Sequence, residues 1–149
     1  MCGRFFIDDE TAKEIQKLVR KIDAQLKKAK MAGDVHPTEF AAVIEAENRE
    51  LRATAKRWGF PSFGNQKVLI NARAETVMEK RMFRDNVQYR RIAIPAAGIY
   101  EWNQAKEKAT FTAEGTEQGK ARILYLAGFM GTLRERIALL FSPQKQMNP

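Results

Sequence analysis

The spacing of apolar residues changes near Pro37 and divides the chain into a helical first part and a strand-rich remainder. Over residues 9–30, apolar side chains recur at steps of three and four residues and form one stripe, made of Ile15, Leu18, Val19, Ile22 and Leu26. This period predicts one amphipathic helix over residues 9–30. Asp8 or Asp9 is placed to cap its first turn, and Gly33 is placed to end it.

Beyond Pro37 the pattern favours β-strands. Two strands, over residues 40–46 and 51–57, lie on either side of a Glu-Asn-Arg segment, and apolar and polar residues alternate along the second of them. Further strands are predicted over residues 68–71, 91–94, 99–102, 110–113, 123–129 and 137–141, with one short helix over residues 75–83. We therefore expect the whole chain, residues 1–149, to form a single α+β domain with a mostly antiparallel sheet.

Composition narrows the classes of protein. The 149 residues are 44% hydrophobic and 30% charged, which suits one packed globular domain. One cysteine excludes an intramolecular disulfide, and no Cys/His cluster has metal-ligand spacing. The chain has neither a secretory signal nor a membrane-spanning apolar run, so a cytoplasmic protein without metal, cofactor or membrane contact is expected. The net charge of +8 suits a polyanionic partner without identifying one.

The single cysteine stands at position 2, directly after the initiator methionine. Removal of Met1 would leave an α-amine beside a thiol, with pKa values of about 8 and about 8.5. Such a 1,2-aminothiol condenses with an aldehyde to a Schiff base and then closes a thiazolidine ring, which a mid-chain cysteine cannot do. Taken alone, the residue favours a plainer interpretation, in which Cys2 is a small buried side chain beginning an N-terminal strand.

A second cluster combines an amide with basic side chains. Asn71 and Arg73 fall where a strand meets a helix, and Arg81 follows further on, so together they could hold a phosphate or a carbonyl. Residues 67–91 contain seven Lys and Arg against three Asp and Glu, an excess of +4 that is half of the chain's net charge. The alternative is an ordinary basic surface with ion pairs to those acids.

A third cluster places Glu101 between Tyr100 and Trp102 in an apolar strand. A carboxyl group in such surroundings can serve as a general acid or base, and Trp102 can stack on an unpaired base. The alternative is a strand whose Glu101 faces water while Trp102 fills the core. Trp58 is expected either to pack internally or to receive a base, and His36, the only histidine, is interpreted as structural.

Three segments occur together: Met-Cys-Gly-Arg-Phe at the N-terminus, Asn-Ala-Arg-Ala-Glu-Thr followed by Arg-Met-Phe in the middle, and Pro-x-x-Gly-x-Tyr-Glu-Trp after that. In this order and spacing they resemble the SRAP family, the SOS response-associated peptidases or abasic site processing proteins, from residue 1 to about residue 129. The resemblance implies a barrel-like sheet with flanking helices. It also implies a DNA-damage function, in which a thiazolidine crosslink protects abasic sites in single-stranded DNA.

Residue roles follow from the resemblance. Cys2 matches the crosslinking nucleophile, exposed when Met1 is removed in an autoproteolytic step to which the name peptidase refers. Asn71 matches the asparagine that positions the deoxyribose, and Glu101 the glutamate that assists ring opening and proton transfer in this lyase-like chemistry. The resemblance assigns a group of DNA-binding side chains to Arg4, Arg73, Arg81, Trp58 and Trp102. The implied partner is single-stranded DNA that contains abasic sites.

The sequence departs from the family after Gly131. Family members continue into a His-x-Arg-Met-Pro segment, whereas here no histidine follows His36 and the tail resembles a truncated or frame-altered end. Loss of a proton-transfer histidine would slow the reaction by on the order of 10²–10⁴, and missing strands would leave sheet edges open. Two other functions therefore stay open: a non-catalytic single-stranded DNA-binding module and a Cys-dependent peptidase.

Overall fold

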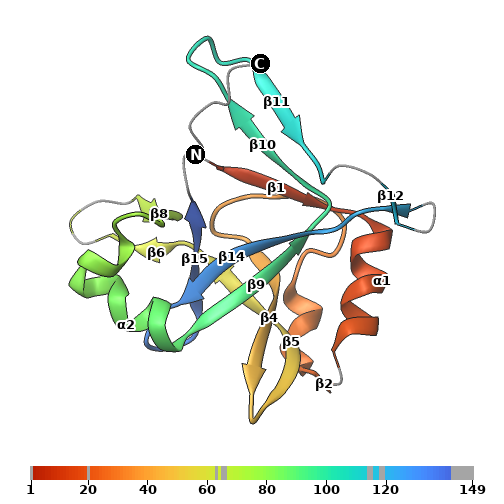
Figure 1. The fold of residues 1–149 in the computed structure, drawn as a ribbon, viewed down its shortest axis with the longest axis horizontal. Helices are drawn as coiled ribbons and strands as arrows, with labels where there is room; N and C mark the ends of the chain where they lie inside the picture. The colour runs from red at the N-terminus through yellow and green to blue at the C-terminus, as the bar shows by residue number, and fades with distance from the viewer. Residues whose placement is uncertain are drawn as a thin grey trace.

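The computed structural model describes residues 2–19, 21–62, 64, 67–113, 116–117 and 120–141 (Figure 1). Helices in this described part flank two larger sheets: α1 (Asp9–Leu18), α2 (Arg81–Tyr89) and the short 3-10 helices η1 (Ala24–Lys28) and η2 (Val77–Glu79). None of the helices within these ranges is long and apolar enough to cross a membrane.

A seven-stranded sheet forms the body of the fold and runs in the order β2-β5-β4-β9-β14-β15-β8. Its strands are β2 (Lys21–Ile22), β4 (Phe40–Glu47), β5 (Glu50–Trp58), β8 (Asn71–Arg73), β9 (Arg91–Ala96), β14 (Leu124–Met130) and β15 (Arg136–Phe141). An additional parallel pairing of β15 with β5 closes β5, β4, β9, β14 and β15 into a ring. The prediction of an α+β fold with a mostly antiparallel, barrel-like sheet is confirmed.

A second, four-stranded antiparallel sheet covers one end of this ring in the order β11-β10-β1-β3. Its strands are β1 (Arg4–Ile7), β3 (Gly33–Val35), β10 (Gly98–Trp102) and β11 (Lys108–Phe111). Two short hairpins complete the described strands: β6 (Phe60–Pro61) with β7 (Val68–Leu69), and β12 (Thr116–Glu117) with β13 (Lys120–Ala121). Since β10 follows β9 after a single residue, the two sheets are directly connected.

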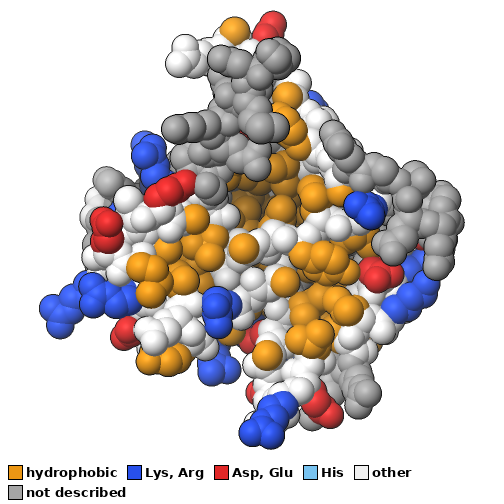
Figure 2. Space-filling model, in the orientation of Figure 1, with side chains coloured by type: hydrophobic (Ala, Val, Ile, Leu, Met, Phe, Trp, Pro, Cys, Tyr) orange, Lys and Arg blue, Asp and Glu red, His pale blue; other side chains and the backbone are white. Residues whose placement is uncertain are grey.

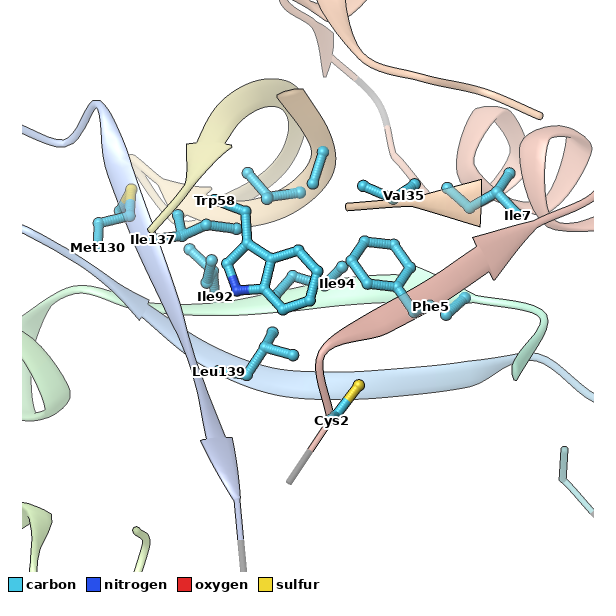
Figure 3. Close-up of a cluster of buried hydrophobic side chains, with 13 residues drawn as sticks. Cys2, Phe5, Ile7, Val35, Trp58, Ile92, Ile94, Met130, Ile137 and Leu139 are labelled. Atoms are coloured by element: carbon cyan, nitrogen blue, oxygen red, sulfur yellow. The ribbon is translucent and has the colours of Figure 1, made fainter. Parts of the chain in front are cut away.

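The main hydrophobic core fills the ring beneath the second sheet (Figure 3). Phe5 and Trp58 are its largest side chains, fully buried, with ring centroids 5.3 Å apart. Burial of side chains of this size contributes about 1.5–3 kcal/mol each to folding. A separate cluster packs α1 and η1 against the outside of β4 and β5. On the face seen in Figure 2, apolar side chains gather toward the middle, and Lys and Arg lie mostly around the margin.

The helix predicted over residues 9–30 is wrong beyond Leu18. The chain leaves α1, pairs with β5 through β2, and then forms η1. Asp23 explains the break, because its main-chain N–H donates to Ala53 of β5 and its side chain accepts from the N–H of Gln25, a local turn that competes with helix. Gly33 does not end a helix. It begins β3 with a φ of +78°.

The predicted strands agree with the structure within a few residues at their ends, with 68–71 divided between β7 and β8. The short helix predicted over residues 75–83 is displaced, because η2 and α2 take its place and α2 continues to Tyr89. Phe83 is buried on the inner face of α2 against Phe60 and Phe129. This packing of an aromatic cluster favours a helix centred later than the sequence predicts.

Candidate active site

Cys2 lies at the margin of the main core, immediately before β1 (Figure 3). Its side chain is 4% exposed, and Sγ donates a hydrogen bond to the main-chain oxygen of Arg4 at 3.3 Å. The interpretation of Cys2 as a small buried residue is therefore confirmed, although the N-terminal strand begins two residues later, at Arg4. A buried position does not exclude the nucleophilic role of Cys2. That role depends on which groups surround the side chain.

Asn71 is the first residue of β8, which pairs with β15 in a parallel register that sets Asn71 beside Leu139. Its Nδ2 donates a hydrogen bond to the main-chain oxygen of Cys2 at 2.7 Å. The amide is 7% exposed, and its Oδ1 is buried without a hydrogen-bond partner in the described part of the chain. A buried acceptor left in this way costs about 1–3 kcal/mol and is a candidate contact for a ligand.

Glu101, half-buried on β10, acts on the cysteine through its charge. Burial, together with the smaller effect of the negative charge of Glu101, raises the pKa of the Cys2 thiol to about 11. About one thiol in 10⁴ is then ionised at pH 7. The structure thus brings three candidates from distant segments together: Cys2, Asn71 and Glu101. It also keeps the sulfur protonated until a base removes the proton.

The second sheet carries Arg4 and Trp102 on its outer face. Arg4 and Tyr100 are direct partners across β1 and β10, so their side chains share this face, and the alternation of a strand turns Glu101 to the opposite one. Trp102 is 40% exposed, and the Arg4 guanidinium lies 5.2 Å from its ring centroid. The alternative in which Glu101 faces water and Trp102 fills the core is therefore wrong.

Sequence reasoning missed the residues that organise this outer face. Asp34 of β3 accepts hydrogen bonds from Arg4 Nη1 at 3.3 Å and from the Tyr100 hydroxyl at 3.1 Å. Lys108 of β11 places Nζ 4.6 Å from the centroid of the Tyr100 ring. The only sequence signal was the alternation of Tyr100 and Trp102 around Glu101, since nothing local predicts that β3 and β11 would flank them.

Arg73 and Arg81 are exposed at the end of β8 and the start of α2. Within the described ranges neither of them forms an ion pair. Two other arginines of the same stretch are engaged locally, because Arg84 donates to the main-chain oxygen of Met78 and Arg90 donates to Asn86. The ion-paired surface considered for residues 67–91 is therefore not seen at Arg73 and Arg81, which remain available to an anion.

Trp58 does not belong to a DNA-binding surface in this structure. Its side chain is 0% exposed, it packs on Phe5, and its indole Nε1 donates to the main-chain oxygen of Ile70 at 3.0 Å. No base can reach a ring in this position, so the assignment of Trp58 to the DNA channel is corrected to a core role. The bond to Ile70 fixes the residue directly before Asn71, which makes Trp58 a support of the site.

His36 is paired away from the cysteine, with Nδ1 3.3 Å from a carboxylate oxygen of Glu39 and its main-chain N–H bonded to the same carboxylate. This is a structural role of the kind predicted. Across the residues that the structure describes, no three His, Cys, Asp or Glu side chains are grouped so that they could hold a metal ion.

Comparison with known proteins gives a consistent set of relatives. The sequence model described as SOS response associated peptidase (SRAP) matches residues 1–146. The abasic site processing protein YoqW of Bacillus subtilis is 33% identical over 115 residues, which cover 72% of this chain and 50% of YoqW. The abasic site processing protein YoaM of the same organism is 32% identical over 118 residues, with the same coverage. The chain spans about half the length of these curated relatives.

Two solved structures share the fold at low sequence identity. A phage-related protein from Bordetella bronchiseptica superposes with a TM-score of 0.64 at 18% identity, covering 95% of this chain and 69% of that protein. A protein from Bacteroides thetaiotaomicron gives a TM-score of 0.62, also at 18% identity, covering 95% of this chain and 66% of the other. At this identity the likeness establishes the fold.

Proposed function

The chain belongs to the SRAP family, and from this premise we propose that it binds single-stranded DNA and captures abasic sites covalently through Cys2 after Met1 is removed. The observation that carries the proposal is the hydrogen bond from Asn71 Nδ2 to the Cys2 main-chain oxygen at 2.7 Å. It anchors the residue that would bear the new α-amine. The relatives named abasic site processing proteins support the choice of substrate.

The order of the two nucleophiles follows from the state of the thiol. An α-amine of pKa about 8 is about one-tenth unprotonated at pH 7, whereas burial raises the pKa of the Cys2 thiol, so that a much smaller fraction of the thiol is ionised. The amine therefore attacks the aldehyde of the ring-opened sugar first, and loss of water gives a Schiff base. The sulfur then adds to the imine carbon, and the thiol proton ends on the former imine nitrogen. The products are one thiazolidine and one water.

Asn71 is proposed to position the reactants, and Glu101 to transfer the proton. In this proposal the Asn71 amide holds the Cys2 main chain, and its buried Oδ1 accepts a hydrogen bond from the sugar. Glu101 is the carboxylate whose charge reaches the thiol. It would take the sulfur proton and return it to nitrogen, a transfer of the kind that contributes on the order of 10²–10⁴ in rate.

DNA is proposed to be held by cations and one aromatic ring without reading the sequence. Arg73 and Arg81 are exposed and free of ion pairs within the described ranges, so they suit phosphate groups. On the outer face of the second sheet, Trp102 offers a partly exposed ring with Arg4 beside it, a combination that suits stacking on an unpaired base. Stacking of this kind favours single strands over duplex.

The decisive experiment begins with intact mass, to establish that Met1 has been removed. The protein is then incubated with uracil-containing single-stranded DNA treated with uracil-DNA glycosylase and run on a denaturing gel without borohydride. A heat-stable adduct is expected with the native protein and none with Cys2→Ala. An adduct of equal yield and stability with Cys2→Ala would refute the thiazolidine. A Cys2→Ala adduct seen only after borohydride would be an ordinary Schiff base, which leaves the proposal intact.

The high pKa of the thiol favours one alternative, a module that binds single-stranded DNA without reacting. It predicts salt-sensitive binding with no adduct in the same gel, from protein that mass analysis shows to lack Met1. The geometry gives less support to a Cys-dependent peptidase acting on other proteins, because the His36 ring is paired with Glu39. Turnover of an unrelated peptide by the purified protein would support the peptidase alternative.

A further inference from the structure

A basic pocket lies against β5, with a volume of about 510 Å³. It is bounded by η1, by β5 and by the turn between β14 and β15. Five cationic side chains line it, against two acidic ones, which leaves a formal charge of +3: Lys28, Lys56, Arg57, Arg134 and Arg136 against Asp23 and Glu135. None of the residues assigned above to DNA capture is among those that line it.

The positive charge of this pocket is only partly balanced by the acidic side chains that line it. None of the five forms an ion pair with an acidic side chain of the described ranges. Asp23 is already engaged, because its carboxylate bonds Arg52 at 3.4 Å and the N–H of Gln25 at 2.6 Å. The positive charge is therefore available to an anion from solution.

Two of the cations form cation–π contacts with the ring of Phe40. The Arg57 guanidinium lies 4.8 Å and the Lys28 ammonium 5.9 Å from the centroid of its ring. Both attractions to the ring are weak at a partly exposed site, about 0.5–1 kcal/mol each, and they hold two like charges near one another. An anion placed between these groups would relieve the repulsion, so the arrangement is electrostatically preformed for a negatively charged ligand.

Main-chain groups of β5 also face the pocket. β2 pairs with β5 at Arg52 and Ala53, and β15 pairs with β5 at Arg57 and Trp58. Between these pairings the described strands leave this edge of β5 uncovered. Ala53 accepts from Asp23, and Arg57 donates to Glu135, across the same edge. By alternation, the N–H and C=O of Ala55 point into the gap as well.

From these observations we propose that the pocket is a second phosphate site, which holds the backbone of a single-stranded nucleic acid at a place separate from the Cys2 site. A +3 lining with guanidinium and ammonium groups matches phosphate oxygens. The volume is within the range of about 300–1,000 Å³ typical of ligand sites, which leaves room for more than one phosphate group. The nucleic-acid source rests on the proposed DNA binding, whereas the phosphate chemistry stands on the pocket alone.

The test measures binding of a short undamaged thymidine oligonucleotide by fluorescence anisotropy over a series of salt concentrations. The variant Lys28→Gln/Arg134→Gln removes two exposed cations of the pocket. The matched control Lys17→Gln/Lys27→Gln removes two exposed cations from α1 and η1 outside it. We expect the slope of log K against log salt to fall by about 0.7 per lost phosphate contact in the pocket variant, and to stay at the native value in the control.

A second arm separates the possible sources of phosphate by titrating pyrophosphate in a calorimeter. Loss of pyrophosphate binding in the pocket variant alone, with an unchanged oligonucleotide slope, would overturn the nucleic-acid source and leave a site for small phosphate compounds. Equal slopes in the two double variants, together with equal pyrophosphate binding, would overturn the whole inference. The pocket variant should still form the abasic-site adduct at saturating DNA. Failure of the proposed function would instead appear as no adduct with the native protein, whatever the slopes.

Discussion

The side chain of Asn71 donates a hydrogen bond to the main-chain oxygen of Cys2 across 69 residues of sequence, at 2.7 Å and in a buried position. This contact joins the seven-stranded sheet, through β8, to the segment that precedes β1 in the second sheet. The place where the two sheets meet is thereby tied to the only cysteine. A single amide therefore affects both the stability of the fold and the position of the proposed nucleophile.

Replacing Asn71 with Ala should reveal both effects. Loss of the buried bond leaves the Cys2 oxygen without its donor, and removal of the unpaired Oδ1 offsets part of that cost, so the free energy of unfolding should fall by about 1–2 kcal/mol. The rate of adduct formation should fall at least tenfold, because the Cys2 main chain is no longer held. Urea unfolding and a gel time course with abasic DNA measure the two. Asn103→Ala is the control, since the Asn103 bonds are exposed; a matching loss of rate there would contradict a special role for Asn71.

The buried thiol predicts a specific dependence of stability on pH. Burial raises the pKa of Cys2 from about 9 to about 11, so the unfolded chain releases the thiol proton first as the pH rises. The stabilisation is complete below pH 9 and is lost progressively between pH 9 and 11, with a total of about 3 kcal/mol. Urea unfolding of the native protein and of Cys2→Ala over this range isolates the cysteine, because other groups titrate alike in both. Parallel curves for the two proteins would contradict the raised pKa.

Much of the fold follows from the sequence because apolar alternation is a direct consequence of one-sided burial. The strands around β4 and β5 illustrate this, since their residues face the ring interior and the helices in turn. The prediction of one helix over residues 9–30 was wrong beyond Leu18 for a reason that is in part non-local. The apolar period continues past Leu18, but the main chain at Ile22 and Asp23 finds partners on the edge of β5, and the Ile22 side chain is left 54% exposed. No local pattern encodes that edge.

The sequence predicted which residues could form the candidate site. It did not predict how their side chains are arranged in space. Cys2, Asn71 and Glu101 are chemically conspicuous wherever they lie. Which face of a strand is buried depends on what packs against it, and so the sequence left both placements of Glu101 and Trp102 open. Trp58 shows the same limit, because an aromatic residue beside an arginine has the same sequence signature at a surface and in a core.

Trp58→Phe should lower stability without weakening DNA binding by the folded protein. The smaller ring leaves a void in the main core, and the Ile70 main-chain oxygen loses its donor. The free energy of unfolding should fall by about 2–4 kcal/mol. Urea unfolding gives the stability, and anisotropy with undamaged single-stranded DNA, measured well below the unfolding transition, gives the affinity. A large loss of affinity with unchanged stability would restore Trp58 to the DNA surface.

Trp102→Ala should have the opposite profile. The ring is partly exposed on the outer face of the second sheet beside Arg4, so its removal should change the free energy of unfolding by less than about 1 kcal/mol. Loss of one base-stacking contact, worth about 1–3 kcal/mol, should weaken binding of single-stranded DNA by about fivefold to 150-fold. Phe111→Ala is the matched control, because Phe111 is an exposed aromatic residue of the same hairpin that shares the opposite face with Ile99. Equal losses of affinity in the two variants, measured by anisotropy at one salt concentration, would show that the outer face does not carry the stacking contact.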